Sequence, residues 1–535
     1  MSATPVLPAP AWPARDGDHL LVSAAQMAAL EAQLFASGLP VEALMEKAAL
    51  AVVRRLMQPD WWPQLQRRGA LVLVGPGHNG GDGLVVAREL HLAGVPVRTW
   101  SPFERHKPLT AAHRRHAQWL GIRELTAPPD PAEGAIWIDA LFGIGQSRPP
   151  GDVLETLLEQ RQRQQPGLLV AIDGPSGLCA DSGQPLGRCA ASASLTLAIG
   201  LIKQGWLQDP ALRWLGQLER IELGLPQPLL QTLPAQQPLA LREGDLPSGP
   251  WPRLDPAAAK YQRGRLLVIA GSAAYRGAAT LALQGANASG CGSLRAALPE
   301  PVAQGLWSLQ PQVVLSAALP DNSHGGLRLE ALPEGALERL DAVVLGPGLG
   351  PEGPDGSEAG AWARLQAFPG LLLLDADGLN RLAARDPLAW LRGRAGPTWL
   401  TPHGGEFGRL FPPWADQPPL EAARHAAEQA SGTHPCSLLL KGARTVVAAA
   451  DGRRWQLAQA NPAAARTGLG DVLAGYAGGL GARGLAAGTG ADAALLGLAA
   501  LSHACAGGAA VQQRGAGGAT AMAVAEMLCA ITQST

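Results

Sequence analysis

The stretch LVLVGPGHNGGDGLVVAREL, residues 71–90, decides the fold of the first half of the chain. Four apolar residues lead into a glycine-rich turn, and the turn leads into residues typical of a helix start. Strand, glycine turn and helix in this order are typical of a parallel sheet covered by helices. Residues 75–80 satisfy the dinucleotide-binding pattern G-x-G-x-x-G. The turn also carries Asn79 and Asp82, an amide and a carboxylate that a simple phosphate-binding turn does not need.

The composition places the chain among globular proteins with more than one domain, because 535 residues exceed one ordinary core. A net charge of −1 gives no electrostatic reason to expect nucleic acid or an anionic membrane as a partner. The N-terminal residues lack a charged segment followed by an apolar run, and no continuous apolar stretch reaches about 18 residues. The six cysteines form no C-x-x-C pair, which favours reduced thiols in a cytoplasmic protein.

Strands and helices alternate in two series. The first has helical periodicity over residues 23–57 and then short apolar strands at 71–74, 95–100, 136–139, 168–172 and 194–199. The second has strands at 266–270, 312–317, 342–345, 371–375, 398–401, 437–440 and 445–449. Residues 224–256 are rich in proline and lose periodicity, as a linker does. We therefore predict two α/β domains, residues 1–230 with a Rossmann-like parallel sheet and residues 240–535 with an α/β sandwich.

Three strands of the first domain end in residues that could share one site, because the carboxyl ends of parallel strands meet at one edge of a sheet. The oxygens of Asn79, Asp139 and Ser176 suit a monovalent cation better than zinc. Asp173, which also follows a strand, could act as a general acid–base group. The alternative is a local role for each residue, with Asn79 as a turn former and the other three as helix caps.

An ordinary dinucleotide-binding domain is a weaker interpretation of the same turn. It needs an acidic residue at the end of the next strand, about 20 residues further on. The strand at 95–100 is followed by Ser101 instead. A Walker loop is excluded, because the sequence contains no Gly-Lys pair.

GPGHNGGDGLVVAREL, DALFGIG and AIDGPSG together resemble the NAD(P)H-hydrate epimerase domain over about residues 20–225. The resemblance implies that Asn79, Asp139 and Ser176 bind potassium and that Asp173 is the catalytic acid–base group. It also implies that Asp173, the turn at 78–82 and the loop at 143–149 contact the hydrated nucleotide. The residues of the turn and loop are His78, Asn79, Gly80, Gly81, Asp82, Gly143, Ile144, Gly145, Gln146, Ser147, Arg148 and Pro149. His78 stands where the family often has a second asparagine, and Lys203 matches a family position without an assigned role.

The second domain contains GLGD at residues 468–471, which predicts a helix that starts near Asp471. Backbone N–H groups and the helix dipole at such a start attract anions. Asp471 either caps the helix or accepts a proton from a hydroxyl that attacks a phosphoryl group. Lys441, at another strand end, is one of only five lysines among 43 basic residues, which suits a required point charge.

Six motifs of the second domain resemble, in family order, the ADP-dependent NAD(P)H-hydrate dehydratase, which has a ribokinase-like fold. They are GRLLVIAGSAAYRGAATLAL, VLGPGLG, LDADGLN, LTPHGGEFGRL, LLLKGARTVV and TGLGDVLAG, within about residues 255–530. The resemblance implies hydrate contacts from Ala278, Gly348, His403 and Asp471. It implies ADP or AMP contacts from Lys441, Gly442, Ala443, Arg444, Thr445 and Gly470, with Mg²⁺ accompanying ADP. The stretch NPAAART departs from the family's glycine-rich N-P-G.

Together the resemblances imply repair of hydrated NADH and NADPH. The first domain would interconvert the R and S hydrates, and the second would use ADP to dehydrate the S hydrate with release of AMP and phosphate. One alternative is a ribokinase-like kinase of a small molecule with a non-catalytic nucleotide-binding N-terminal domain. We further expect a cytoplasmic homo-oligomer that acts on small molecules and binds neither nucleic acid nor membrane.

Overall fold

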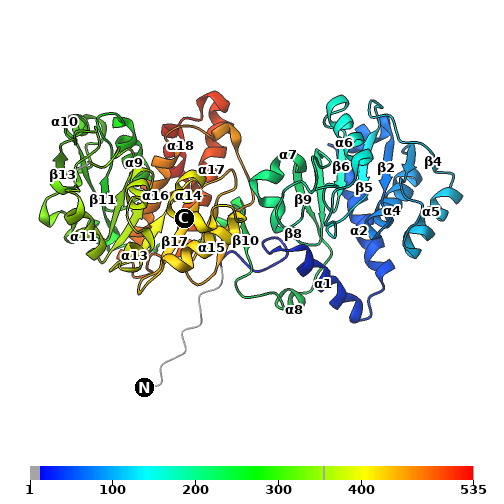
Figure 1. The fold of residues 1–535 in the computed structure, drawn as a ribbon, viewed down its shortest axis with the longest axis horizontal. Helices are drawn as coiled ribbons and strands as arrows, with labels where there is room; N and C mark the ends of the chain where they lie inside the picture. The colour runs from blue at the N-terminus through cyan, green and yellow to red at the C-terminus, as the bar shows by residue number, and fades with distance from the viewer. Residues whose placement is uncertain (1–11, 354–355, 534–535) are drawn as a thin grey trace, which may run out of the picture. The chain divides into compact units, whose positions relative to one another are not determined.

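The structure, a computed structural model, describes residues 12–353 and 356–533 and divides into two compact units (Figure 1). The N-terminal unit runs from Arg15 to Pro238, and the C-terminal unit comprises the described residues from Leu239 onward together with residues 12–14. Trp12 contacts the C-terminal unit, since its indole N–H donates to the Asp245 carbonyl and its own carbonyl accepts from Trp455, each at 3.0 Å. Residues 1–11, where the sequence predicts no leader, lie outside the described residues.

The N-terminal unit has a seven-stranded parallel sheet in the order β4-β3-β2-β5-β6-β7-β9. Its strands are β2 (Ala70–Val74), β3 (Val97–Trp100), β4 (Arg123–Leu125), β5 (Ile136–Ala140), β6 (Leu169–Ile172), β7 (Leu195–Ile199) and β9 (Gln217–Ile221). The order reverses between β2 and β5, and ligands of such sheets bind at this switch point. The short β1 (Leu21–Val22) pairs separately with β8 (Ile202–Lys203).

Helices cover both faces of this sheet. They are α1 (Ala24–Ala36), α2 (Val41–Leu56), α3 (Trp62–Arg68), α4 (His78–Leu92), α5 (Pro108–Trp119), α6 (Asp152–Gln164), α7 (Leu212–Leu215) and α8 (Gln227–Leu230), with 3-10 helices η1 (Gln204–Leu207) and η2 (Asp209–Ala211). Helices α1 and α2 confirm the periodicity predicted for residues 23–57. The Ser23 hydroxyl and the Gln26 side chain cap α1 reciprocally, which fixes where it begins. On one face α2 and α4 pack against β2 and β5, and α6 covers the other.

The C-terminal unit has a ten-stranded sheet in the order β10-β19-β18-β17-β16-β15-β14-β11-β12-β13. Its strands are β10 (Leu239–Leu241), β11 (Arg265–Ile269), β12 (Ser293–Pro299), β13 (Val314–Leu319), β14 (Ala342–Leu345), β15 (Leu371–Leu374), β16 (Thr398–Leu400), β17 (Cys436–Leu440), β18 (Val446–Ala448) and β19 (Arg454–Leu457). All pairs are parallel except β17–β18 and β18–β19. The predicted α/β class is confirmed, whereas the expected linker at 224–256 contains β10 and α8.

The helices of the C-terminal unit are α9 (Arg276–Ala288), α10 (Glu300–Leu309), α11 (Ala359–Ala367), α12 (Asp377–Ala383), α13 (Pro387–Arg392), α14 (Gly404–Leu410), α15 (Pro419–Ala430), α16 (Leu469–Ala486), α17 (Ala493–Gly518) and α18 (Ala521–Gln533). The 3-10 helices are η3 (Glu243–Asp245), η4 (Lys260–Arg263), η5 (Leu329–Ala331), η6 (Glu334–Leu337), η7 (Pro412–Trp414) and η8 (Pro462–Ala464). Leu267 and Ile269 of β11 face the core that includes α11, α12, α14 and α15, while Gly478 of α16 packs on Val344 across the opposite face.

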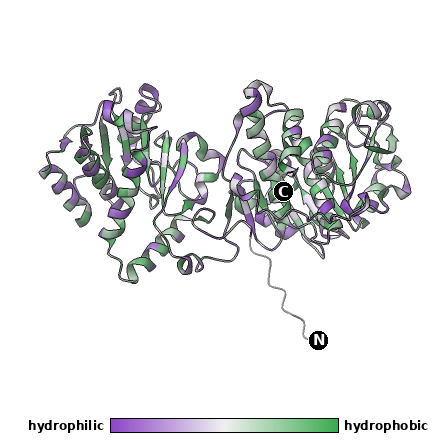
Figure 2. Cartoon of the chain, turned by 180° about the vertical axis from the view of Figure 1, so that it is seen from behind, coloured by the Kyte–Doolittle hydropathy of each residue, from purple (hydrophilic) through white to green (hydrophobic). Residues whose placement is uncertain are grey.

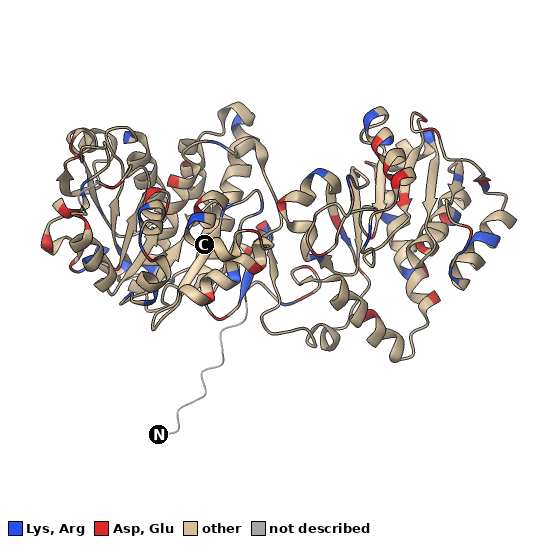
Figure 3. Cartoon of the chain, in the orientation of Figure 1, with Lys and Arg blue, Asp and Glu red and all other residues tan. Residues whose placement is uncertain are grey.

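Helix α17 is long and apolar enough, by length and composition, to cross a membrane, but 67% of its most apolar window is buried inside the fold. A mostly buried apolar helix of this kind is typical of a protein core. In Figure 2 hydrophobic residues gather in the strands and on the helix faces toward them. Figure 3 shows both signs of charge interspersed over the helices of each unit.

Candidate active sites

The first candidate site lies at the switch point of the N-terminal sheet and centres on Asp139, a fully buried residue of β5. The Ser176 hydroxyl donates to one carboxylate oxygen at 2.7 Å, and the Ser176 backbone N–H donates to the other at 2.8 Å. The Leu141 N–H also donates to Asp139, at 3.2 Å. Burial raises the pKa of Asp139, and these hydrogen bonds only partly oppose the rise.

Asn79 reaches the same edge from the first turn of α4. Its side-chain NH₂ donates to the Ile172 carbonyl at 3.2 Å. Its Oδ1 atom is buried and has no hydrogen-bond partner among the described residues. Asp139 likewise has no ion pair within the described part of the chain. The structure therefore places an orphaned amide oxygen beside the end of β6 and a buried carboxylate without a counter-charge at the end of the neighbouring strand β5.

The local alternatives for these residues are wrong. Asp139 lies inside a strand, and Asp173 and Ser176 lie in a turn that no helix follows, so none of the three caps a helix. Asn79 is the second residue of α4, whose N-cap is Gly77, so it is not a turn former. Helix capping and turn formation therefore do not explain why these four polar residues occur at these positions.

Asp173 forms an ion pair with Lys203, the residue whose role the sequence left open. The Lys203 ammonium donates to Asp173 Oδ1 at 2.7 Å and to the Ile199 carbonyl at 2.8 Å, and the lysine has no exposed area. The Ile199 N–H donates to the same carboxylate oxygen at 3.3 Å. Asp173 also has a φ of 51°, which is uncommon for a residue with a side chain and is frequent at functional sites.

The glycines of the turn at 78–82 serve close packing. A Cβ on Gly80 would lie 2.1 Å from the Gly75 carbonyl oxygen, and one on Gly81 would lie 2.7 Å from the Met45 methyl group. Gly80 and Gly81 are both buried in the first turn of α4, and a ligand could contact them only through their backbone atoms. His78, the first residue of the helix, lies at its exposed end.

The loop at 143–149 is partly committed to the protein itself. The Gln146 side chain donates to the Pro175 carbonyl at 3.1 Å and accepts from the Gly177 N–H at 2.6 Å. A Cβ on Gly143 would lie 3.2 Å from Asp173 and 3.4 Å from Asn79, so this glycine lies between the two site residues. Ile144 is half-buried, while the exposed residues of the loop are Gly145, Ser147, Arg148 and Pro149.

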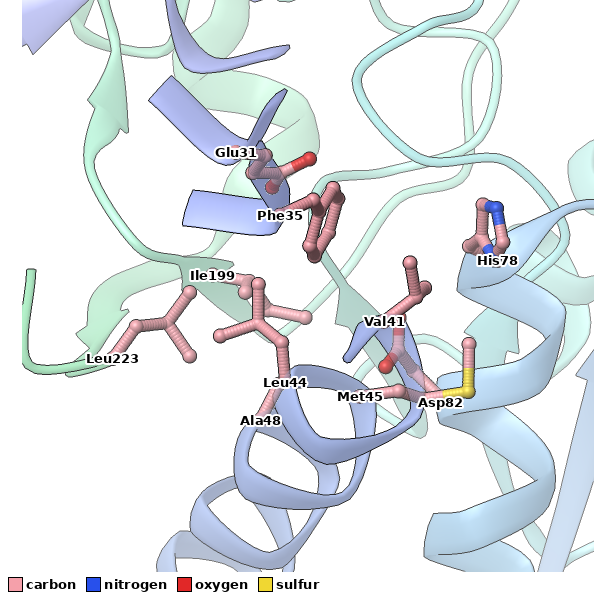
Figure 4. A pocket seen from close by; sticks show the side chains of 10 residues that line it. All are labelled: Glu31, Phe35, Val41, Leu44, Met45, Ala48, His78, Asp82, Ile199 and Leu223. Carbon is pink, nitrogen blue, oxygen red and sulfur yellow. The ribbon is translucent and has the colours of Figure 1, made fainter. Parts of the chain in front are cut away.

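A pocket of about 100 Å³ opens beside this cluster, between α1, α2 and the start of α4 (Figure 4). Its wall is apolar except for Glu31, His78 and Asp82. Burial raises the pKa of Asp82 well above its usual range and that of Glu31 to about 7. The sequence prediction missed Glu31. The sequence did contain a signal for this residue. Glu31 lies four residues from both Met27 and Phe35, and this spacing puts its carboxyl group on the apolar face of α1.

The second candidate site lies at the carboxyl edge of the C-terminal sheet, where Lys441 follows β17. Its ammonium group lies 2.7 Å from Asp375 and 3.9 Å from Glu406. The Thr401 hydroxyl donates to the same oxygen of Asp375 at 2.8 Å. Burial lowers the pKa of Lys441, but the two carboxylates outweigh burial and the net direction is upward. Asp375 and Glu406 were within the quoted motifs but were not predicted as site residues.

Helix α16 begins at Leu469, two residues before the predicted start, because Gly468 adopts a left-handed conformation (φ 90°) as its N-cap. Asp471 therefore lies in the first turn and is not the N-cap. A Cβ on Gly470 would lie 3.6 Å from the Lys441 ammonium, so the helix start and the lysine face each other. Burial, then the charge of Asp375, raises the pKa of Asp471 to about 7, against the effect of Lys441.

His403 is the N-cap of α14 and borders Lys441. Its Nδ1 accepts from the Gly405 N–H at 3.0 Å, and its Nε2 lies 3.3 Å from Glu406. The Lys441 N–H donates to the Pro402 carbonyl at 2.8 Å, which joins the two strand ends. More than half of the His403 side chain is exposed, so the ring remains available to a ligand.

The remaining predicted contacts divide into two groups. Gly348 (φ 65°) and Ala278 are adjacent, since a Cβ on Gly348 would lie 2.7 Å from the Ala278 methyl group. In the turn after Lys441, Gly442 and Ala443 are exposed and Thr445 is half-buried, but Arg444 is only 8% exposed. The Arg444 side chain is thus enclosed by the fold, and only its backbone is suited to a nucleotide contact.

Comparisons with known proteins agree in both halves. Residues 41–205 match the family described as YjeF-related protein N-terminus, and residues 266–531 match the family described as NAD(P)H-hydrate dehydratase. The bifunctional NAD(P)H-hydrate repair enzyme Nnr of Gloeobacter violaceus is 44% identical over 86% of this chain and 88% of its own length. The protein of the same name from Synechocystis is 42% identical over 86% and 85%.

Among solved structures, the ADP/ATP-dependent NAD(P)H-hydrate dehydratase of Bacillus subtilis, co-crystallised with ATP and Mg²⁺, is 25% identical. The similarity covers 55% of this chain and 98% of that one, with a TM-score of 0.43. The family assignment rests on the Gloeobacter and Synechocystis relatives, which are 42–44% identical and are matched over more than two thirds of their length. The chain belongs to the family of bifunctional NAD(P)H-hydrate repair enzymes.

Proposed function

We propose that the N-terminal unit interconverts the R and S hydrates of NADH and NADPH and that the C-terminal unit dehydrates the S hydrate with ADP, releasing AMP and phosphate. One observation carries the proposal. Each sheet edge holds a carboxylate near an ammonium group: Asp173 pairs with Lys203, and Asp471 lies at the helix start that faces Lys441. Family membership over most of the chain supports both activities.

We propose that Asn79, Asp139 and Ser176 hold a potassium ion. The orphaned Oδ1 of Asn79 and the buried charge of Asp139 fit such an ion, since amide, carboxylate and hydroxyl oxygens with one negative charge suit a monovalent cation. When bound, the ion supplies positive charge that compensates Asp139 and favours an anionic substrate near the start of α4. The backbone N–H groups of that helix start would bind phosphate oxygens of the substrate.

Asp173 is the acid–base group of the epimerisation. The added hydroxyl of the hydrate lies on the carbon next to the ring nitrogen, whose lone pair can expel it once it is protonated. Asp173 donates that proton, the hydroxyl leaves as water, and addition of water to the other face inverts the centre. Lys203 is a positioning residue, because its hydrogen bond holds one oxygen of Asp173 and leaves the other directed toward Gly143.

Asp471 is the base of the dehydration. It accepts the proton of the ring hydroxyl as that hydroxyl attacks the β-phosphate of ADP, which releases AMP. Lys441 and the N–H groups at the start of α16 stabilise the charge that develops on phosphate. The phosphorylated hydroxyl then leaves as phosphate, a better leaving group than hydroxide, as the ring nitrogen lone pair forms a carbon–nitrogen double bond. Loss of a proton from the adjacent ring carbon to solvent water restores the reduced nicotinamide.

We propose that Mg²⁺ enters the second site with ADP. Among the residues that the structure describes, no group of three His, Cys, Asp or Glu side chains is arranged to hold a metal ion. A cation held mainly by nucleotide phosphates, as Mg²⁺ commonly is, does not need such a group. When bound, the ion supplies charge neutralisation at the phosphates, beyond that from Lys441.

The alternative, a small-molecule kinase with a non-catalytic N-terminal domain, is not favoured. Relatives align with the chain across both units, and Asp173 with its buried lysine is an unexpected arrangement for a domain that only binds. We also propose a cytoplasmic homo-oligomer. The six cysteines form no disulfide, which suits a reducing compartment. Light scattering of the purified chain would give its assembly state.

The deciding experiment supplies the purified chain with a mixture of R and S hydrates and ADP and follows absorbance of the reduced nicotinamide. We expect a fast phase from the S hydrate and a slower, complete conversion of the R hydrate. Asp173→Ala should stop after the fast phase on a timescale shorter than spontaneous epimerisation, and Asp471→Asn should lose both phases. A stable phosphorylated product formed with ATP would instead support the kinase.

A further inference from the structure

Glu31 of α1 has a carboxyl group at the pocket beside the first site and has no assigned function. Figure 4 shows Glu31 and Phe35 on α1, with His78 and Asp82 on α4 and the apolar side chains of α2 along the wall. In the described part of the chain the Glu31 side chain forms no ion pair or hydrogen bond. A carboxylate that lies on the apolar face of a helix and has no partner lowers the stability of the fold. Stability therefore does not explain the presence of Glu31.

The charges that face Glu31 come from three other elements. Asp173, after β6, disfavours the Glu31 carboxylate, and Lys203 of β8 favours it. Asp82 and His78 line the same pocket from α4, and Asp82 is itself affected by Glu31 and Asp173. Helix α2 contributes apolar side chains to the pocket, while its Lys47 donates to the Leu223 carbonyl at 2.5 Å. Three carboxyl groups thus interact near one ion-paired lysine.

Ile199 connects this pocket to Asp173. Its side chain lines the pocket, while its backbone N–H donates to Asp173 Oδ1 at 3.3 Å. The pocket is therefore bounded by α1 on one side and by Ile199, at the end of β7, on another, and the Ile199 backbone contacts Asp173. A ring that enters it would meet the carboxyl groups of Glu31 on α1 and Asp82 on α4.

The chemistry of the proposed epimerisation needs two such groups. Water must leave one face of the ring and enter the opposite face, and a single carboxyl group cannot serve both faces of a bound ring. We propose that the pocket takes the hydrated nicotinamide ring and that Glu31 is the second acid–base group of the epimerase, serving the face opposite Asp173. This inference rests on the function proposed above.

In one direction, protonated Glu31 gives its proton to the hydroxyl, the carbon–oxygen bond breaks, and the ring nitrogen lone pair forms a carbon–nitrogen double bond. The Asp173 carboxylate, held by Lys203, then takes a proton from a solvent water as that water adds to the other face. One water leaves and one enters, and the net result inside the site is a proton moved from Glu31 to Asp173. Solvent exchange resets the pair, and the reverse reaction uses the same groups in exchanged roles.

The test measures epimerisation in the full chain carrying Glu31→Gln, with the fast S-hydrate phase as an internal measure of the second site. We expect about 100-fold slower R-hydrate conversion, an unchanged fast phase and a melting temperature that is unchanged or higher. The parent pH profile should contain a titration near 7, in line with the raised pKa of Glu31, that the variant lacks. Glu31→Asp should restore part of the rate. Glu104→Gln, which removes an exposed carboxylate of the same unit, is the matched control and should behave as the parent.

A second measurement follows oxygen. In H₂¹⁸O the parent should incorporate one solvent oxygen into the hydrate for each inversion. Glu31→Gln with a rate within twofold of the parent and the same pH profile overturns this inference alone, as does inversion without solvent oxygen. A parent chain that does not accelerate epimerisation above the spontaneous rate overturns the proposed function and this inference with it.

Discussion

Lys203 donates a 2.7 Å hydrogen bond to Asp173 from a position with no exposed area. The lysine lies over the Trp206 ring at 4.8 Å and also bonds the Ile199 carbonyl, so three contacts hold its ammonium group. Such a buried ion pair is poor evidence for stability, because desolvation offsets much of the attraction. In the proposed epimerisation the importance of the ion pair is geometric, since it orients the Asp173 carboxylate.

Lys203→Met should therefore slow R-hydrate conversion by about 10-fold or more, since Asp173 loses its orienting partner and counter-charge. The variant should also melt at a lower temperature, because an unpaired carboxylate remains. Lys203→Arg should not restore the rate, since a guanidinium does not fit a fully enclosed ammonium site. The fast S-hydrate phase is the control and should be unchanged; its loss together with the slow phase would indicate general misfolding instead.

The potassium site makes a prediction about ion dependence. Replacing K⁺ by a bulky organic cation should lower both the epimerisation rate and the melting temperature, because Asp139 is buried without another counter-charge. Asp139→Asn removes that charge, so its melting temperature should no longer respond to K⁺. Differential scanning fluorimetry across a K⁺ series checks both points. An equal K⁺ response in parent and variant would contradict the site.

The raised pKa of Asp471, about 7, sets the pH dependence of dehydration. Only the ionised carboxylate can accept the proton of the hydroxyl, so the rate at saturating substrates should rise with pH through about 7 and then level off. Asp471→Asn should reduce the rate by about 100-fold or more. R-to-S conversion, followed by chromatography, should be unaffected in this variant. A dehydration rate independent of pH between 6 and 8 would argue against Asp471 as the base.

The same carboxyl group makes a prediction about stability. Its folded pKa lies above the ordinary value of 3.8, so between about pH 4 and 7 the folded chain binds this proton more tightly than the unfolded chain. Asp471 therefore lowers the free energy of unfolding as pH rises through that window. Asp471→Asn should flatten this part of the curve, measured by urea unfolding at pH 5 and pH 8. If the free energy of unfolding fell more steeply with pH in the variant than in the parent, the pKa of Asp471 would be lowered by folding and not raised.

Substitutions at two glycines of α16 test ligand binding and helix packing separately. A Cβ on Gly470 would lie 3.6 Å from the Lys441 ammonium, an ordinary contact, whereas one on Gly475 would lie 1.8 Å from the Ala282 carbonyl oxygen. Gly470→Ala should raise the KM for ADP by about 10-fold, because a methyl group narrows the helix start, and leave stability unchanged or slightly higher. Gly475→Ala should lower stability, because α9 and α16 must move apart. Steady-state kinetics and thermal unfolding distinguish the two effects.

The strands whose boundaries the sequence predicted well are those buried on both faces, such as β2, β5 and β15, because such strands are continuous apolar runs. Edge strands β4 and β9 were missed because polar, half-exposed residues interrupt their apolar pattern. Strand β12 was missed because Arg295 breaks its run. The reversal at β18 was also missed, since parallel and antiparallel neighbours have similar short apolar sequences.

The order of motifs in the sequence by itself determined which strand ends are candidates for the sites, because a glycine turn after an apolar strand has few local conformations. It also singled out Asp173, Asp471 and Lys441 as residues of interest. Only the tertiary structure decided their partners: Lys203 with Asp173, Asp375 with Lys441, and Glu31 at a pocket near Asp173. These pairs join segments far apart in the chain, and burial and charge, which set their pKa values, arise only when the sheet edges are assembled.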